Sequence, residues 1–121
     1  FVPEQTGGYQ LDNRAEDPAA MAAGATSAER VTYKDANDEG DAAMAEWRTP
    51  EEAEAYARSR GPADFPGVAP LGEGPIGPNP GHYWYYEKDG VGTVNWHQGQ
   101  YSASFTGTPY EVQEFFLAFP R

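Results

Sequence analysis

The sequence contains no cysteine, so disulfide bonds, thiolate catalysis and cysteine-ligated zinc sites are excluded. It also lacks any apolar run approaching the roughly 20 residues that cross a bilayer, and we expect no membrane span within the chain. Basic side chains are scarce: 8 lysines and arginines accompany 19 aspartates and glutamates, which gives a net charge of −11. Because so acidic a surface repels phosphate backbones, nucleic acid is not an expected partner.

Large aliphatic side chains are few as well, because much of the 39% hydrophobic content is alanine. The core must therefore come largely from the 17 aromatic residues, most of which follow residue 82. At 121 residues the chain is long enough for one modest core. It starts at Phe1 rather than at methionine, and we interpret it as a processed, extracytoplasmic chain: secreted, periplasmic or anchored through an N-terminal segment.

Composition divides the chain into two stretches, and the second contains a Pro/Gly-rich segment. Residues 1–28 hold few large apolar side chains, and we expect an extended N-terminal arm with at most one or two helical turns. Residues 29–121 are expected to form a single α+β domain. Within it, residues 61–81 hold six of the eleven prolines and six of the fourteen glycines. That density favours neither a helix nor a ladder strand, and predicts a loop that follows the surface.

Two helix starts have almost the same sequence, Thr-Pro-Glu-Glu at 49–52 and Thr-Pro-Tyr-Glu at 108–111. In each, the Thr side chain can accept from the backbone N–H three residues on, Pro fills the first helical position, and Glu can reach back to the cap. The first helix is expected to end at Gly61. The second places Val112 and Phe115 on an apolar stripe that can cover a sheet.

Short β-type segments account for most of the remaining chain. An N-terminal hairpin is predicted from residues 31–34 and 42–47, which a polar turn separates. A three-stranded antiparallel meander is predicted from residues 83–88, 91–97 and 101–106, with an Asp-Gly turn at 89–90 and a Gln-Gly turn at 98–99. In its third strand apolar and polar side chains alternate, so one face is expected to be buried and the other polar.

The fold class is therefore predicted to be α+β. It is a two-layer sandwich in which one antiparallel sheet, the N-terminal hairpin plus the C-terminal meander, carries the two capped helices on one face.

A calcium site is one hypothesis for the polar turn. Asp35, Asn37, Glu39, Gly40 and Glu46 have the spacing of an EF-hand loop, in which oxygen ligands surround the ion and the glycine allows a sharp turn. However, a strand-like segment precedes them where an entering helix is needed. A polar hairpin turn with solvated carboxylates is the favoured alternative, and we expect no cofactor other than this weak calcium ion.

The two histidines flank the aromatic strands of the meander. If those strands pair around the Asp-Gly turn, His82 lies directly across from His97. The pair could share a metal, or one imidazole could act as a base beside Glu87, but a third ligand, a nucleophile and an oxyanion donor are all missing from the pattern. We favour a cross-strand surface pair without a catalytic role.

The consecutive aromatics Tyr83, Trp84, Tyr85 and Tyr86 cannot all face one core, because alternate side chains of a strand point to opposite sides. With Trp96 across the hairpin, one set could form an exposed platform for a sugar, a peptide or a protein. The competing interpretation is that the N-terminal arm and the Pro/Gly loop cover the second face, which would make all five ordinary core residues.

We predict a non-enzymatic, extracytoplasmic protein-interaction module, an accessory subunit of a membrane-associated complex whose partner is another protein. The missing nucleophile, the acidic surface, and an arm and loop that need something to pack on favour this function. The alternative is a small-ligand module that binds a glycan or peptide on the Tyr/Trp platform, with or without calcium. A hydrolase or isomerase built on His82, His97, Glu87 and Tyr85 ranks last.

Overall fold

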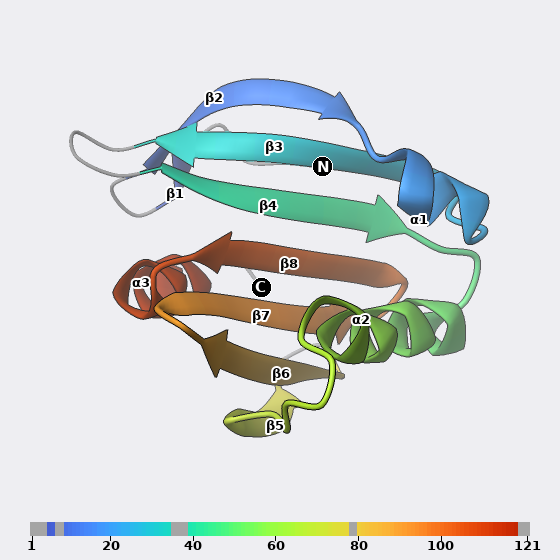
Figure 1. Ribbon diagram of the computed structural model, residues 1–121. Helices are drawn as coiled ribbons and strands as arrows, with labels where there is room; N and C mark the ends of the chain where they lie inside the picture. The colour runs from blue at the N-terminus through green and yellow to red at the C-terminus, as the bar shows by residue number, and fades with distance from the viewer. Residues whose placement is uncertain (1–4, 7–8, 35–38, 78–79, 119–121) are drawn as a thin grey trace.

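The computed structural model of the protein describes residues 5–6, 9–34, 39–77 and 80–118 (Figure 1). Within these residues eight strands form one antiparallel sheet in the order β1-β2-β3-β4-β8-β7-β6-β5. The strands are β1 (Gln5–Thr6), β2 (Tyr9–Glu16), β3 (Ser27–Lys34), β4 (Glu39–Glu46), β5 (Gly72–Ile76), β6 (Gly81–Lys88), β7 (Val91–Gln98) and β8 (Tyr101–Gly107). The helices are α1 (Pro18–Ala22), α2 (Pro50–Asp64) and α3 (Pro109–Ala118).

Both predicted sheet components are present, and one strand pairing joins them. Strands β3 and β4 form the N-terminal hairpin, and β6, β7 and β8 form the meander. Strand β4 pairs with β8, with Ala42 opposite Phe105, so the hairpin and the meander make one continuous sheet. The predicted α+β class, an antiparallel sheet with helices packed on it, is confirmed.

The two turns of the meander use residues with positive φ. Asp89 (φ 53°) and Gly90 (φ 80°) are both left-handed, as a type I′ turn requires. The second turn lies one residue later than predicted, because Gln98 still pairs with Tyr101. Gly99 then takes φ 54° as the first turn residue, which is where a type II′ turn needs glycine.

Both predicted helix starts are confirmed by their hydrogen bonds. The Thr49 hydroxyl accepts from the Glu52 backbone N–H at 3.1 Å. The Thr108 hydroxyl accepts from the Glu111 N–H at 3.3 Å, and the Thr108 N–H donates to the Glu111 carboxylate at 2.7 Å. This reciprocal pair is a complete capping box, and it explains why Glu111 is buried although it is ionisable.

The Pro/Gly-rich segment is more regular than predicted. Helix α2 does not end at Gly61 but continues through Pro62 to Asp64, and the Phe65 N–H closes its last turn on the Gly61 carbonyl at 2.7 Å. Further along, Gly72–Ile76 forms strand β5, which pairs with β6. Since β5 is at the edge of the sheet, its proline removes no ladder hydrogen bond to a second neighbour.

The segment predicted to be an extended arm, residues 1–28, is part of the sheet over most of its described length. Strand β2 pairs with β3, with Leu11 opposite Tyr33. Asp17 then caps α1 by accepting from the Ala20 N–H at 3.3 Å, and Ala20 is buried. Because strand pairing uses backbone groups, this segment is held in place with few large apolar side chains.

The pleat of the sheet assigns alternate side chains to two faces. On β6, Trp84 and Tyr86 lie on the face covered by α1 and α2, where the Tyr86 ring lies against Gly61. Tyr83, between them, lies on the opposite face and contacts Phe116 of α3 with 5.3 Å between ring centroids. Helix α2, with α1 beside it, therefore covers one face, and α3 covers the other at the far end of the sheet (Figure 1). The two capped helices were predicted to share one face, and they pack on opposite faces instead, because the apolar stripe of α3 meets the rings on the far side of β8.

The larger core lies on the α3 face. Phe105 of β8 stacks on Phe115 of α3 at 3.8 Å between ring centroids and 12° between ring planes, and both side chains are fully buried. A Cβ at Gly40 would collide with the Phe105 ring, so glycine is needed there. The buried members of this core are Val31, Tyr33, Ala42, Val94, Trp96, Phe105, Val112 and Phe115. The α2 face has two smaller clusters, one rich in alanine around Trp47 and one around Trp84.

Candidate functional site

The five aromatics of the predicted platform do not share one exposed surface. Trp84 and Tyr86 are buried beneath α2, and Trp96 is buried on the α3 face. These three side chains are therefore core residues rather than a surface for stacking. Tyr83 and Tyr85 are half-buried, and they alone of the five border an open cavity.

That cavity is an apolar groove of about 640 Å³ between strands β5 and β6 and helix α3. Tyr83 and Tyr85 contribute from the sheet, and Val112 and Phe116 contribute from the helix. The Phe116 ring also packs edge-on against the buried Trp96, at 5.1 Å between ring centroids, and this contact fixes the position of the Phe116 ring. Every described side chain that lines the groove is uncharged. We call this cavity the α3-face groove.

Two leucines on its walls are largely exposed. Leu71 precedes β5 and is 68% exposed, and Leu117 of α3 is 75% exposed. The Leu71 backbone is held because its N–H donates to the Tyr85 carbonyl at 2.7 Å. Exposed leucines on both sides of an apolar groove are typical of a surface that another molecule covers.

Acidic side chains lie beside the groove. The Tyr85 hydroxyl donates to the Glu87 carboxylate at 3.1 Å. Burial, with a further contribution from this hydrogen bond, raises the pKa of Tyr85 to about 12, so the hydroxyl stays a donor across the physiological range. Glu114 is exposed on α3, one turn before Leu117. An apolar floor with the Glu87 carboxylate bonded to one of its side chains favours a partner that is apolar at its centre and basic at its edge.

The two histidines lie as the strand register predicts, His82 directly opposite His97. The His82 Nε2 is 3.0 Å from the Glu73 carboxylate. His97 is buried, its Nδ1 has no hydrogen-bond partner among the described residues, and burial lowers its pKa. Across the described part of the chain, no group of three histidine, aspartate or glutamate side chains is placed to hold a metal.

Two of the predicted calcium ligands, Asp35 and Asn37, lie outside the described residues. The other two, Glu39 and Glu46, are at opposite ends of β4. Seven strand steps separate them by about 23 Å, at roughly 3.3 Å per residue. Glu39 instead approaches Lys34 on the neighbouring strand at 3.9 Å. The segment from 39 to 46 is therefore a strand, and it does not bring these two carboxylates to one ion.

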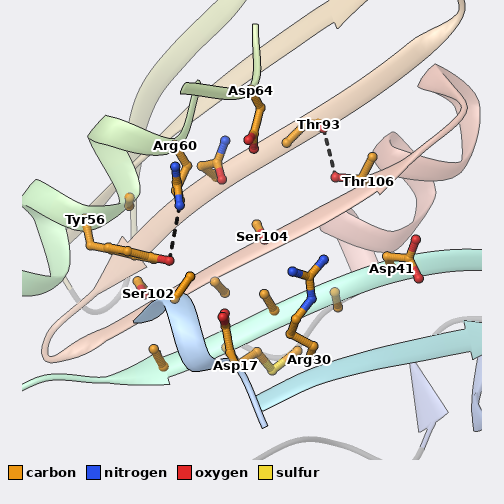
Figure 2. Close-up of a pocket in the computed structure, with 18 residues that line it drawn as sticks. Asp17, Arg30, Asp41, Tyr56, Arg60, Asp64, Thr93, Ser102, Ser104 and Thr106 are labelled. Carbon is orange, nitrogen blue, oxygen red and sulfur yellow. Dashed lines mark hydrogen bonds between the residues drawn. The ribbon is translucent and has the colours of Figure 1, made fainter. Parts of the chain in front are cut away.

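A second, smaller cavity lies on the opposite face, between α2 and strands β3, β4, β7 and β8 (Figure 2). This cavity was not predicted, because the alternation of Ser102, Ser104 and Thr106 along β8 indicates a polar face but not that a helix covers it. One signal was available in β7, where Thr93 and Asn95 alternate with Val94 and an aromatic neighbour. Polar side chains within so apolar a strand indicate a buried polar site rather than a solvated one.

Comparison with known proteins gives a fold relationship only. No family model matches the chain, and no curated protein matches it. Among solved structures it is similar to a GTP binding regulator from Thermotoga maritima, with a TM-score of 0.64 and 13% sequence identity. The superposition covers 94% of this chain and 76% of the Thermotoga chain. At that identity the likeness shows a shared fold.

Each helix in the described part of the chain is too short or too polar to span a bilayer.

Proposed function

We propose that the protein is a non-enzymatic interaction module that works outside the cytoplasm, as an accessory subunit of a membrane-associated complex. The α3-face groove is its docking site. The observation that carries this proposal is the pair Leu71 and Leu117, exposed on the two walls of a groove whose floor is aromatic. Full burial of a leucine side chain is favourable by roughly 1.5–3 kcal/mol. A docked partner that covers these two leucines would gain up to that free energy from each of them.

The partner we propose is a protein segment with an apolar ridge and flanking lysines or arginines. The groove provides the apolar contact, and the Glu87 carboxylate, which is bonded to Tyr85 of the groove, provides negative charge beside it. The net charge of −11 acts in the same direction, because it steers basic surfaces toward the protein and repels acidic ones.

The decisive experiment places a photo-crosslinking amino acid at Leu117 in the native host. The matched control places it at Met21, which is 44% exposed and lies outside the α3-face groove. We expect one stoichiometric adduct from position 117, found in the membrane fraction, and none from position 21. The adduct should be lost when Leu71→Asp is added. Equal adducts from both positions, or a lone soluble monomer, would overturn the proposal.

The charge requirement is tested separately with two synthetic amphipathic helices. One carries leucines on one face and lysines elsewhere, and the other has every lysine replaced by glutamate. We expect the lysine peptide to bind at least about tenfold more tightly at low salt, with the difference shrinking as salt rises. Equal affinities would contradict the proposed basic edges.

A further inference from the structure

The cavity on the α2 face arises from one row of the sheet. Arg30, Ala43, Ser104 and Asn95 lie side by side on four adjacent strands, β3, β4, β8 and β7. The two middle positions carry small side chains, so the row is hollow at its centre. Helix α2 forms one wall of the hollow, which has a volume of about 160 Å³ (Figure 2).

At the inner end of this row is a buried amide without a partner. Asn95 is only 1% exposed, and its Nδ2 makes no hydrogen bond among the described residues. The Nε of Arg60, from α2, is likewise buried and unpartnered. A buried polar group without a hydrogen bond costs about 1–3 kcal/mol, and such groups are rare in native proteins. Both atoms belong to residues that line the hollow.

The charges around the hollow are not paired with one another. Among the described residues, neither Arg30 nor Arg60 has a carboxylate within 4.0 Å. Arg60 Nη1 donates to the Tyr56 hydroxyl at 3.4 Å, as Figure 2 shows. This hydrogen bond is the main cause of the raised pKa of Arg60, with smaller contributions from the carboxylates of Asp64 and Asp17. The guanidinium therefore stays charged and has both carboxylates in its vicinity.

The lining as a whole is slightly acidic. Asp17, Asp41 and Asp64 supply three carboxylates against the two guanidiniums of Arg30 and Arg60. Asp17 is buried, while Asp41, Asp64 and Arg30 are exposed and lie at the open side. A ligand that carries only negative charge would meet net repulsion here. A ligand that carries only positive charge would leave the unpartnered donors of Asn95 and Arg60 unsatisfied.

We propose that this cavity binds a small zwitterion of the amino acid class. Its carboxylate accepts from Asn95 Nδ2 and Arg60 Nε. Its ammonium group faces the buried carboxylate of Asp17, which lies across the cavity from Arg60 and Asp64 (Figure 2), and the Ser104 hydroxyl is available to either end. The volume limits the ligand to a molecule with a short side chain, because sites for larger organic ligands run from about 300 to 1,000 Å³. This inference is independent of the partner proposed for the α3-face groove.

Calorimetric titration of the purified protein tests the proposal with L-alanine and L-serine as probes. Acetate and ethylamine serve as the separate halves of the zwitterion. We expect saturable binding of at least one amino acid, and at least about tenfold weaker binding of both halves. If acetate binds as well as alanine, the site is an anion site and the proposal is wrong. If no probe binds at millimolar concentration, the proposal is also overturned.

Variants then assign the binding to the cavity. Arg60→Gln and Asn95→Leu should each weaken binding at least about tenfold. The matched control is Arg58→Gln on the same helix, since Arg58 pairs with Glu54 at 2.6 Å and does not line the cavity. It should change affinity less than about twofold. Ala43→Leu, which fills the hollow without removing a polar group, covers the case in which Asn95→Leu does not fold. Unchanged affinity in a folded Ala43→Leu protein would exclude this site.

Discussion

The two faces of the sheet are built by the same strands and have opposite characters. On β8, Phe105 points to the α3 face and stacks on Phe115, while Ser104, its neighbour in sequence, points to the hollow on the α2 face. The α3 face is closed at its centre by large rings and leaves an apolar groove at its edge. The α2 face is closed at its ends by alanine and tryptophan clusters and leaves a polar hollow at its centre. The α3 face therefore has one continuous core and the α2 face has two separate clusters, and each face leaves a different kind of recognition surface.

The sharpest test of that division compares neighbouring residues on β8. Phe105→Ala removes a fully buried ring and its stack on Phe115, and should lower the free energy of unfolding by about 3–5 kcal/mol. Ser104→Ala changes a side chain at the hollow on the other face, and should alter the free energy of unfolding by less than about 0.5 kcal/mol. Urea unfolding followed by circular dichroism measures both values. Similar losses for the two variants would mean that both faces contribute equally to the core.

The α2 face nevertheless contains one buried polar contact that should matter for stability. The Trp47 indole N–H donates to the Ser102 hydroxyl at 2.9 Å, and both side chains are buried. Ser102→Ala leaves that N–H without an acceptor, and should cost about 1–3 kcal/mol in the same urea experiment. Ser102→Thr keeps the hydroxyl and serves as the control. A loss in Ser102→Ala no greater than in Ser104→Ala would show that water replaces the hydroxyl.

Much of the fold could be predicted because its strongest signals are local. The Thr-Pro-x-Glu helix starts at Thr49 and Thr108 depend on hydrogen bonds within four residues, and the Asp89-Gly90 turn depends on two backbone conformations. The exceptions depend on partners far away in the chain. Strand β5 forms because it pairs with the edge of β6, and strand β2 forms because it pairs with the edge of β3. Neither pairing can be predicted from the composition of β5 or β2 alone.

The candidate sites were less predictable for the same reason. The run from Tyr83 to Tyr86 indicated that its side chains divide between the two faces of β6, but which of them stay accessible depends on where α2 and α3 pack. The polar hollow needs Arg60 from α2 and Asn95 from β7 to line one cavity on the same face of the sheet. Sequence alternation identified polar positions on β8, yet it could not show that a helix passes over them.

A smaller effect, of opposite sign, is expected at Asn95. Asn95→Leu replaces an unpartnered amide by an apolar side chain of similar size, and should raise the free energy of unfolding by about 1 kcal/mol in the absence of ligand. The matched variant is Thr93→Val on the same strand and face. Thr93 shares a hydrogen bond with Thr106 at 2.9 Å, so that variant should lower the free energy by about 1 kcal/mol. Destabilisation by both would show that the Asn95 amide is already satisfied in solution.

The smallest expected effect is a pH dependence that comes from the α2 face alone. Burial lowers the pKa of His97 from its usual 6.5; Arg58 and His82 act in the same direction, and Glu54 opposes them. Because the folded pKa lies below the unfolded one, the unfolded chain binds more protons between the two values. The contribution of His97 to stability is therefore complete above pH 6.5 and is lost as the pH falls toward the folded pKa, with a slope of at most about 1.4 kcal/mol per pH unit. Urea unfolding between pH 7.5 and 5 should show this slope in the wild type and in His82→Gln, and should lose it in His97→Gln. A slope that survives in His97→Gln would assign the titration to another group.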